Sequence, residues 1–165
     1  MLARAVLPLA LLFILSACGG STKPEPAATK GVTGTGFRFD VPVGWKVGRA
    51  GDAVTARNGS AFVSVTTYRL LKPYDAALFD RAAAELDRSV AKLAQQAKGT
   101  LVEKKTTEVA ARKIRDYRYV AKGFATRLGF VFEAKREWQL LCRARAEDDD
   151  PDGACKLLFE SFSVS

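Results

Sequence analysis

The cysteines carry the most reactive side chains of this sequence, and there are three of them, Cys18, Cys142 and Cys155. The sequence contains no histidine, which excludes Cys–His and Ser–His nucleophile pairs and the usual zinc sites. Cys142 and Cys155 lie 13 positions apart, not at the Cys-x-x-Cys spacing typical of a redox-active or metal-binding pair. We expect them to form a structural disulfide, because the N-terminus reads as an export signal and exported chains meet an oxidising compartment.

Carboxylates are the other groups that could catalyse a reaction without histidine. A pair of them could hydrolyse a glycoside, but the acids of this chain concentrate in one run over residues 147–152. That run lacks the ligand spacing and the glycine of an EF-hand, and Asp150 and Asp152 suit the start of a helix. We therefore expect a protein that is not an enzyme, with no catalytic residue, no metal and no cofactor. A histidine-free hydrolase with a carboxylate pair is the alternative.

The arginines of the late strands are the candidate binding residues. The chain has 26 Lys and Arg against 18 Asp and Glu, a formal charge of +8, and residues 101–145 alone hold 12 basic and 5 acidic side chains. A two-residue loop at Gly123-Phe124, followed by an odd-length loop before Trp138, places one apolar side toward the core. The opposite side then aligns Val120, Arg127 and Arg143 in one row. The anion-binding candidates are Arg118, Arg127, Arg143 and Arg145.

Such a row of arginines has two interpretations. Like charges directly across neighbouring strands are destabilising unless a negative group joins them. That group could be a ligand, such as a lipid headgroup, a cell-wall phosphate or an acidic glycan. It could also be internal, supplied by Asp116, Glu133 and the acidic residues 147–152, which would turn the arginines into salt bridges. We expect no nucleic acid partner, because an exported basic protein meets anionic lipids and wall polymers instead.

The N-terminus predicts the location of the protein. Residues 1–17 combine Arg4, an apolar run and small residues before a predicted cleavage site, which is the arrangement of a secretory signal peptide. The ending Leu15-Ser16-Ala17-Cys18 resembles the bacterial lipobox, which implies cleavage before Cys18 and its acylation. The alternative is ordinary secretory cleavage that leaves Cys18 free. Residues 18–35 predict a flexible tether. We expect a protein anchored in the lipid bilayer through Cys18, on the extracytoplasmic side of the cell membrane.

The remaining residues, 36–165, read as one α+β domain. Steps of three and four between apolar residues predict one long helix over 75–98, with Asp75 as its cap and Gly99 at its end. A short helix begins at Asp150-Pro151. We expect an antiparallel β-sheet with the long central helix and the short C-terminal helix packed on it. A hairpin at Asn58-Gly59 joins two of the eight predicted strands. Seven of these strands are predicted over residues 37–41, 53–57, 61–71, 101–109, 113–121, 126–134 and 138–144, and the eighth starts after a turn within residues 42–47.

Three features together resemble a known family. They are the segment from Phe39 to Trp45, the single long helix, and Cys142 and Cys155 followed by Ser161-Phe162. Over residues 36–165 the chain is similar to actinobacterial lipoproteins of the PsbP-like family (Mog/PsbP, LpqN type). The resemblance implies an α/β/α sandwich that serves as a non-catalytic binding or adaptor module of the cell envelope, and it supplies no active-site motif. Its partner would be an envelope protein or an anionic envelope component. A structural spacer or chaperone for an envelope complex is a further alternative.

Overall fold

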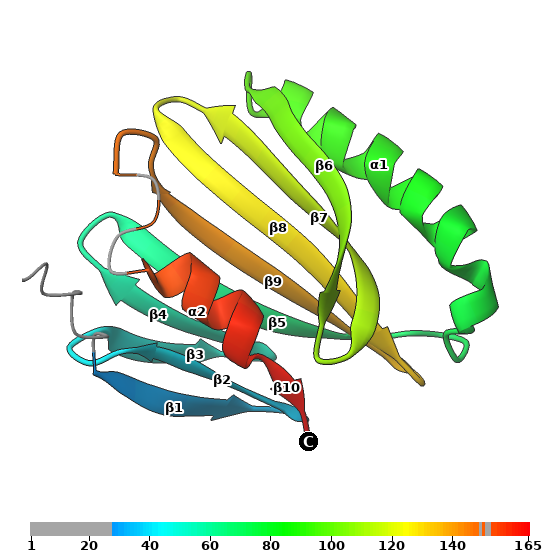
Figure 1. Ribbon diagram of the computed structural model, residues 1–165, viewed down its shortest axis with the longest axis horizontal. Helices are drawn as coiled ribbons and strands as arrows, with labels where there is room; N and C mark the ends of the chain where they lie inside the picture. The colour runs from blue at the N-terminus through cyan, green and yellow to red at the C-terminus, as the bar shows by residue number, and fades with distance from the viewer. Residues whose placement is uncertain (1–27, 149, 151–152) are drawn as a thin grey trace, which may run out of the picture.

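The protein folds into three layers. The computed structural model describes residues 28–148, 150 and 153–165. Figure 1 shows the helix α1 on one side of a large twisted sheet, with the helix α2 and a small sheet on the other side. Every strand pair is antiparallel. The expected α+β class, with one long helix and one short C-terminal helix, is therefore confirmed.

The large sheet has seven strands in the order β3-β4-β5-β9-β8-β7-β6. Because side chains alternate along each strand, this sheet has an α1 face and an α2 face. The predicted hairpin between β4 and β5 is present, with Gly59 and Ser60 as its loop. The strands are β3 (Lys46–Ala50), β4 (Ala53–Asn58), β5 (Ala61–Arg69), β6 (Thr100–Val109), β7 (Arg112–Ala121), β8 (Phe124–Glu133) and β9 (Arg136–Arg145).

The small sheet consists of β1 (Thr29–Gly34), β2 (Phe37–Pro42) and β10 (Ser163–Val164), with β2 in the middle. The tether predicted over residues 18–35 is wrong at its C-terminal end, because β1 pairs with β2 over its full length. The polar, glycine-containing composition of β1 conceals a strand in which Val32 alone is buried. The rest of the predicted tether, and the predicted signal over residues 1–17, lie outside the described residues.

Helix α1 (Phe79–Gln96) follows a short 3₁₀ turn over Ala76–Leu78. The Asp75 carboxylate accepts a hydrogen bond from the Ala77 backbone N–H, as expected of a cap. The helix packs on β6 and β7, and it buries Ala83, Val90 and Ala94. Leu93, which the sequence places on the buried face, is 41% exposed. Only part of the α1 face is therefore covered by this helix.

Helix α2 (Ala154–Ser161) packs on the α2 face and closes the main core between the two sheets. A disulfide between Cys142 on β9 and Cys155 on α2 fastens it there, with the two Cα atoms 5.5 Å apart, which confirms the predicted pairing. Gly129 on β8 makes the contact possible, because a Cβ atom at this position would lie 2.8 Å from the Phe159 ring of α2. The disulfide and this glycine together set the distance between helix and sheet.

The register of the late strands differs from the predicted one in two places. The β7–β8 loop is Lys122-Gly123, not Gly123-Phe124, because both residues adopt the positive φ angles of a tight hairpin turn. This shift of two residues leaves every side chain on its expected face. The β8–β9 loop has two residues instead of an odd number, and it places Trp138 opposite Val131. That change of parity moves the side chains of β9 to the other face.

Candidate functional site

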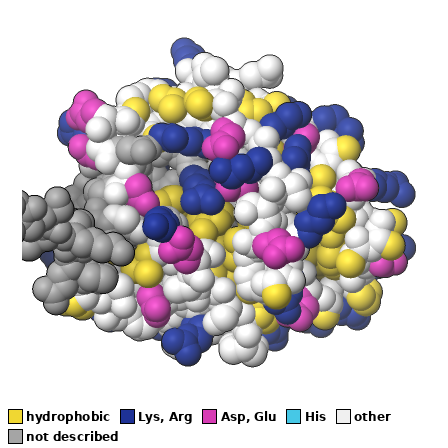
Figure 2. All heavy atoms as spheres, in the orientation of Figure 1, with side chains coloured by type: hydrophobic (Ala, Val, Ile, Leu, Met, Phe, Trp, Pro, Cys, Tyr) yellow, Lys and Arg dark blue, Asp and Glu magenta, His cyan; other side chains and the backbone are white. Residues whose placement is uncertain are grey.

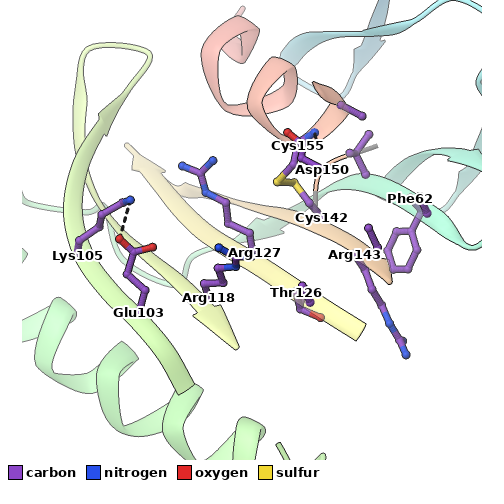
Figure 3. A pocket seen from close by; sticks show the side chains of 15 residues that line it. Phe62, Glu103, Lys105, Arg118, Thr126, Arg127, Cys142, Arg143, Asp150 and Cys155 are labelled. Carbon is purple, nitrogen blue, oxygen red and sulfur yellow. Dashed lines mark hydrogen bonds and ion pairs between the residues drawn. A yellow bond between two sulfur atoms is a disulfide. The ribbon is translucent and has the colours of Figure 1, made fainter. Parts of the chain in front are cut away.

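The structure separates the four candidate arginines into two pairs. Arg118 lies directly opposite Arg127, and both point to the α2 face. Arg143 lies opposite Thr126, and Arg145 opposite Phe124, on the α1 face. Figure 3 shows Arg127 and Arg143 extending to opposite sides of the sheet. The predicted row of Val120, Arg127 and Arg143 is therefore wrong, because the even loop before β9 reverses the face of Arg143.

A pocket of about 250 Å³ lies on the α2 face beside α2, and we call it the helix-side pocket. Strands β5 to β9 form its floor and walls, and the disulfide closes one side (Figure 3). Figure 2 shows this face of the molecule, where basic and acidic side chains gather in the middle of the view above hydrophobic ones. The charged side chains that line the pocket on this face are Glu103, Lys105, Arg118, Arg127 and Asp150.

Arg127 is held by a buried carboxylate. Its Nε and Nη2 donate to Asp116 at distances of 2.8 to 3.2 Å, and Asp116 is only 3% exposed. Its guanidinium also stacks over the Phe159 ring, 3.8 Å from the ring centroid. Internal neutralisation, the second interpretation of the arginines, thus accounts for Arg127. Among the described residues, the Nη1 donor of Arg127 is the part of this guanidinium that is left to a ligand.

The two carboxylates that line the helix-side pocket are also engaged. Glu103 accepts a hydrogen bond of 2.9 Å from Lys105, and this bond lowers the pKa of the Glu103 carboxyl. Asp150 accepts hydrogen bonds from the backbone N–H groups of Cys155 and Lys156, at 2.6 and 2.9 Å, and so caps α2. A general acid at neutral pH needs a raised pKa. The pocket is therefore suited to binding by N–H donors rather than to proton transfer.

Arg143 is among the residues that line this pocket, but its side chain extends to the α1 face (Figure 3), and Arg145 does not line the pocket. The Arg143 guanidinium sits over the Phe124 ring, 4.2 Å from its centroid. Arg145 forms an exposed ion pair with Glu147 at 3.4 Å, a type of pair that contributes little. Both side chains remain accessible on the part of the α1 face that α1 leaves uncovered.

The strongest electrostatic cluster is one that the sequence did not indicate. Asp87 on α1 accepts hydrogen bonds from Arg115 at 2.7 Å, from the Tyr117 hydroxyl at 2.8 Å and from Lys104 at 3.2 Å. The Arg115 contact contributes most to lowering the pKa of Asp87 to about 2, and burial raises the pKa of Tyr117. This cluster fixes α1 on β7, and none of its residues lines the helix-side pocket. Its role is structural.

Two further catalytic patterns fail on geometry. A Ser-x-x-Lys spacing occurs at Ser89 and Lys92, but both side chains are exposed on α1. Burial raises the pKa of Glu137, yet this carboxyl lies on the α1 face near the start of β9, away from Glu103 and Asp150. In the described part of the chain, no three His, Cys, Asp or Glu side chains are grouped as metal ligands. Over the same residues, no helix has the length and apolarity needed to cross a membrane.

The fold is similar to solved structures whose sequences have diverged far from this one. The solution structure of cyanobacterial PsbP (CyanoP) from Synechocystis sp. PCC 6803 superposes with a TM-score of 0.61 at 15% identity, covering 92% of this chain and 99% of that one. A crystal structure from Bacteroides thetaiotaomicron VPI-5482 superposes with a TM-score of 0.57 at 7% identity, covering 86% of this chain and 49% of that one. No protein-family model and no curated protein matches the sequence. The chain therefore has a PsbP-like fold.

Proposed function

We propose that this protein is a membrane-anchored, extracytoplasmic lipoprotein that acts as a non-catalytic binding or adaptor module of the cell envelope. The lipobox-like ending at Cys18 and the apolar run before it support the anchor. The PsbP-like fold and the disulfide support a folded domain in an oxidising compartment. The partner is an envelope protein or an anionic envelope component that occupies the helix-side pocket.

One observation carries the choice of binding over catalysis. Among the described residues, each acid at the helix-side pocket is already engaged, Asp116 by Arg127, Glu103 by Lys105 and Asp150 by the backbone of α2. These contacts leave the Nη1 group of Arg127 and the apolar walls of the pocket for a ligand. Guanidinium groups bind carboxylates and phosphates through paired N–H donors. An anionic group attached to a partly apolar partner is the ligand that fits.

The test compares the loss of positive charge on the α2 face of the sheet with the same loss on the α1 face. The full acylated chain is inserted into neutral phosphatidylcholine vesicles, and the retention of a soluble glycerol-phosphate polymer is measured by flotation. The variant Lys105→Gln/Arg118→Gln removes two charges from the pocket but keeps the Arg127–Asp116 pair, and we expect it to lose retention about tenfold. The variant Arg143→Gln/Arg145→Gln removes the same charge from the other face and should retain the polymer.

Three results would contradict this assignment. Equal losses in both variants would mean that the polymer responds to net charge alone. Unchanged retention in both, or no retention by the wild type, would remove the helix-side pocket as an anion site. In the last case, cross-linking in native envelopes decides between a protein partner and none, since recovery of bulk envelope protein alone would contradict the adaptor role.

The anchor is tested independently of the pocket. Cys18→Ser should move the protein from the membrane fraction to the soluble exported fraction, because two or more acyl chains are needed for stable anchoring and the variant has none. Mass spectrometry of the wild-type N-terminal peptide should show an acylated Cys18. A wild-type peptide with a free Cys18 thiol would overturn the lipoprotein assignment while leaving the binding test untouched.

A further inference from the structure

A second and larger pocket lies at the other end of the α2 face, and we call it the turn-side pocket. Its volume is about 770 Å³, within the range of small-molecule sites. Several segments that are distant in sequence meet there: the β1–β2 turn at Thr35, the β3–β4 turn at Asp52, the end of β5, the β8–β9 turn and β10. Its basic side chains are Arg69, Lys135 and Arg136, all exposed.

Arg69 and Arg136 lie directly opposite each other on β5 and β9. The Leu70 N–H donates to the Lys135 carbonyl at 2.9 Å, so the next pair is a hydrogen-bonded one. Because hydrogen-bonded and non-hydrogen-bonded pairs alternate, Arg69 and Arg136 form a non-hydrogen-bonded pair, in which the side chains are closest. Two like charges in this position are destabilising. The register places the two arginine residues side by side in the lining of the pocket.

Among the described residues, no carboxylate forms an ion pair with either arginine of this pair. Glu133, the neighbour of Arg136 on β8, also lines the pocket, but its ion pair is with Arg112. Asp52 lines the same pocket, but neither it nor the two arginines forms an ion pair with any residue in the described ranges. The two guanidinium groups therefore keep their N–H donors for a group from outside the chain.

The Arg136 side chain also lies against the β1–β2 turn. Gly36 has a φ of +74°, and a Cβ atom there would lie 2.1 Å from Nη1 of Arg136. The guanidinium thus rests directly on the β1–β2 turn, and any other residue at this position would displace it. Behind it, the Trp138 indole N–H and the Thr67 hydroxyl both donate to the Thr35 carbonyl, at 3.5 and 3.4 Å. The back wall of the pocket is therefore tied to the same turn.

We propose that the turn-side pocket binds a phosphate dianion, free or as a monoester of a small polar molecule, between Arg69 and Arg136. Two guanidinium groups balance a charge of about −2, which a phosphate monoester carries above its second pKa of about 6, and each offers a fork of N–H donors to its oxygens. Lys135 adds a third positive charge at the rim. The volume leaves room for a body attached to the phosphate. This site is separate from the helix-side pocket and does not depend on the function proposed for it.

The first experiment titrates the full chain, kept in detergent micelles at pH 7.5, with inorganic phosphate and then with a hexose phosphate. Amide chemical shifts of Thr67, Arg69 and Arg136 should change and saturate, and the melting temperature should rise with phosphate. Sodium chloride at equal ionic strength should have neither effect. Arg69→Gln/Arg136→Gln should abolish both responses, and Arg143→Gln/Arg145→Gln should keep them. A stronger response to the hexose phosphate than to phosphate would identify the ligand as a monoester.

Several results would overturn the proposal. They are a response equal to that of sodium chloride, a response that survives in Arg69→Gln/Arg136→Gln, and shifts confined to the helix-side pocket. If the double glutamine variant fails to fold, Arg69→Lys/Arg136→Lys keeps both positive charges but removes the paired N–H donors of the guanidinium groups. It should weaken phosphate binding at least threefold, and unchanged binding would contradict the arrangement inferred here.

Discussion

Two pairs of arginines face each other across neighbouring strands of the α2 face, and their surroundings differ. At the helix-side pocket Arg127 opposes Arg118, and the buried Asp116 binds Arg127. At the turn-side pocket Arg69 opposes Arg136, and no carboxylate of the described residues binds either. Arg118, Arg127 and Arg136 all belong to the basic segment over residues 101–145, but Arg69 comes from a strand far away in the sequence. Charge density in the sequence thus does not show which arginines an acid of the same chain will bind.

Strand register explains the difference. Asp116 stands opposite Gly129, which has no side chain, so Arg127, two residues away on β8, can reach the carboxylate. The corresponding acid beside Arg136 is Glu133, and it is drawn toward Arg112. The arginine pair is therefore partly neutralised at the helix-side pocket, where Asp116 binds Arg127, whereas neither arginine of the turn-side pair has such a partner among the described residues. The following predictions test this contrast, beginning with the largest effect.

Replacing the buried acid should cost the most stability. Asp116→Ala leaves the half-buried Arg127 without its partner, and breaking such a pair typically costs 3 to 5 kcal/mol, so we expect the free energy of unfolding to fall by about 4 kcal/mol. Urea unfolding followed by circular dichroism measures it. The double variant Asp116→Ala/Arg127→Ala should lose less than the sum of the single losses. A loss below about 1 kcal/mol in Asp116→Ala would remove the contrast between the two ends.

Removing the disulfide should affect one end only. Cys142→Ser/Cys155→Ser should lower the free energy of unfolding by about 3 kcal/mol, the amount expected for a loop of this length. Hydrogen exchange should increase in α2 and around the helix-side pocket. The phosphate response of the turn-side pocket should persist, because its walls do not include α2. Loss of that response would show that the two ends are not independent.

Asp87 extends the contrast to Arg115, an arginine on the α1 face that an acid binds. Its pKa is about 2 in the folded protein, below its ordinary value of 3.8, so its contribution is complete above pH 4 and is lost as the pH falls toward 2. We expect the wild type to lose about 2 kcal/mol more than Asp87→Asn over this range. Acid unfolding at matched ionic strength measures the difference. Parallel curves for the two proteins would show that Arg115 does not depend on the charge of Asp87.

The smallest predicted effect is a gain in the free energy of unfolding rather than a loss. Arg69→Gln should raise the free energy of unfolding by about 0.5 kcal/mol in phosphate-free buffer, because it removes a like-charge pair across two strands. Arg118→Gln at the other end should not be stabilising, since its charge belongs to a network that contains acids. Thermal unfolding of both variants side by side provides the comparison. A loss of stability in Arg69→Gln would mean that this arginine has a stabilising contact.

Much of the fold follows from local sequence. The long helix, its cap at Asp75, the hairpin between β4 and β5 and the disulfide were all predicted. These features depend on residues close together or on the reactivity of cysteine. The missed strand β1 has a polar composition, and only its pairing with β2 reveals it. Its stability comes from a partner strand rather than from its own pattern.

The sites were harder to predict because they depend on whether a loop has an even or an odd number of residues. A single residue in the loop before β9 decides which face carries Arg143, and local composition does not specify whether that loop is even or odd. The turn-side pocket is harder still, since it assembles from chain segments far apart in sequence. A sequence pattern identifies a strand far better than it identifies what converges at the strand's end.

The disulfide also has a consequence for when the helix-side pocket comes into being. Cys142 lies in a central strand of the large sheet, and Cys155 lies on α2, which follows every strand of that sheet in the sequence. The bond can therefore form only after all strands of the large sheet have been synthesised and the chain has met an oxidant. A chain held in a reducing compartment would carry α2 without this fastening. The wall of the helix-side pocket that this disulfide fastens is thus completed only in an oxidising compartment.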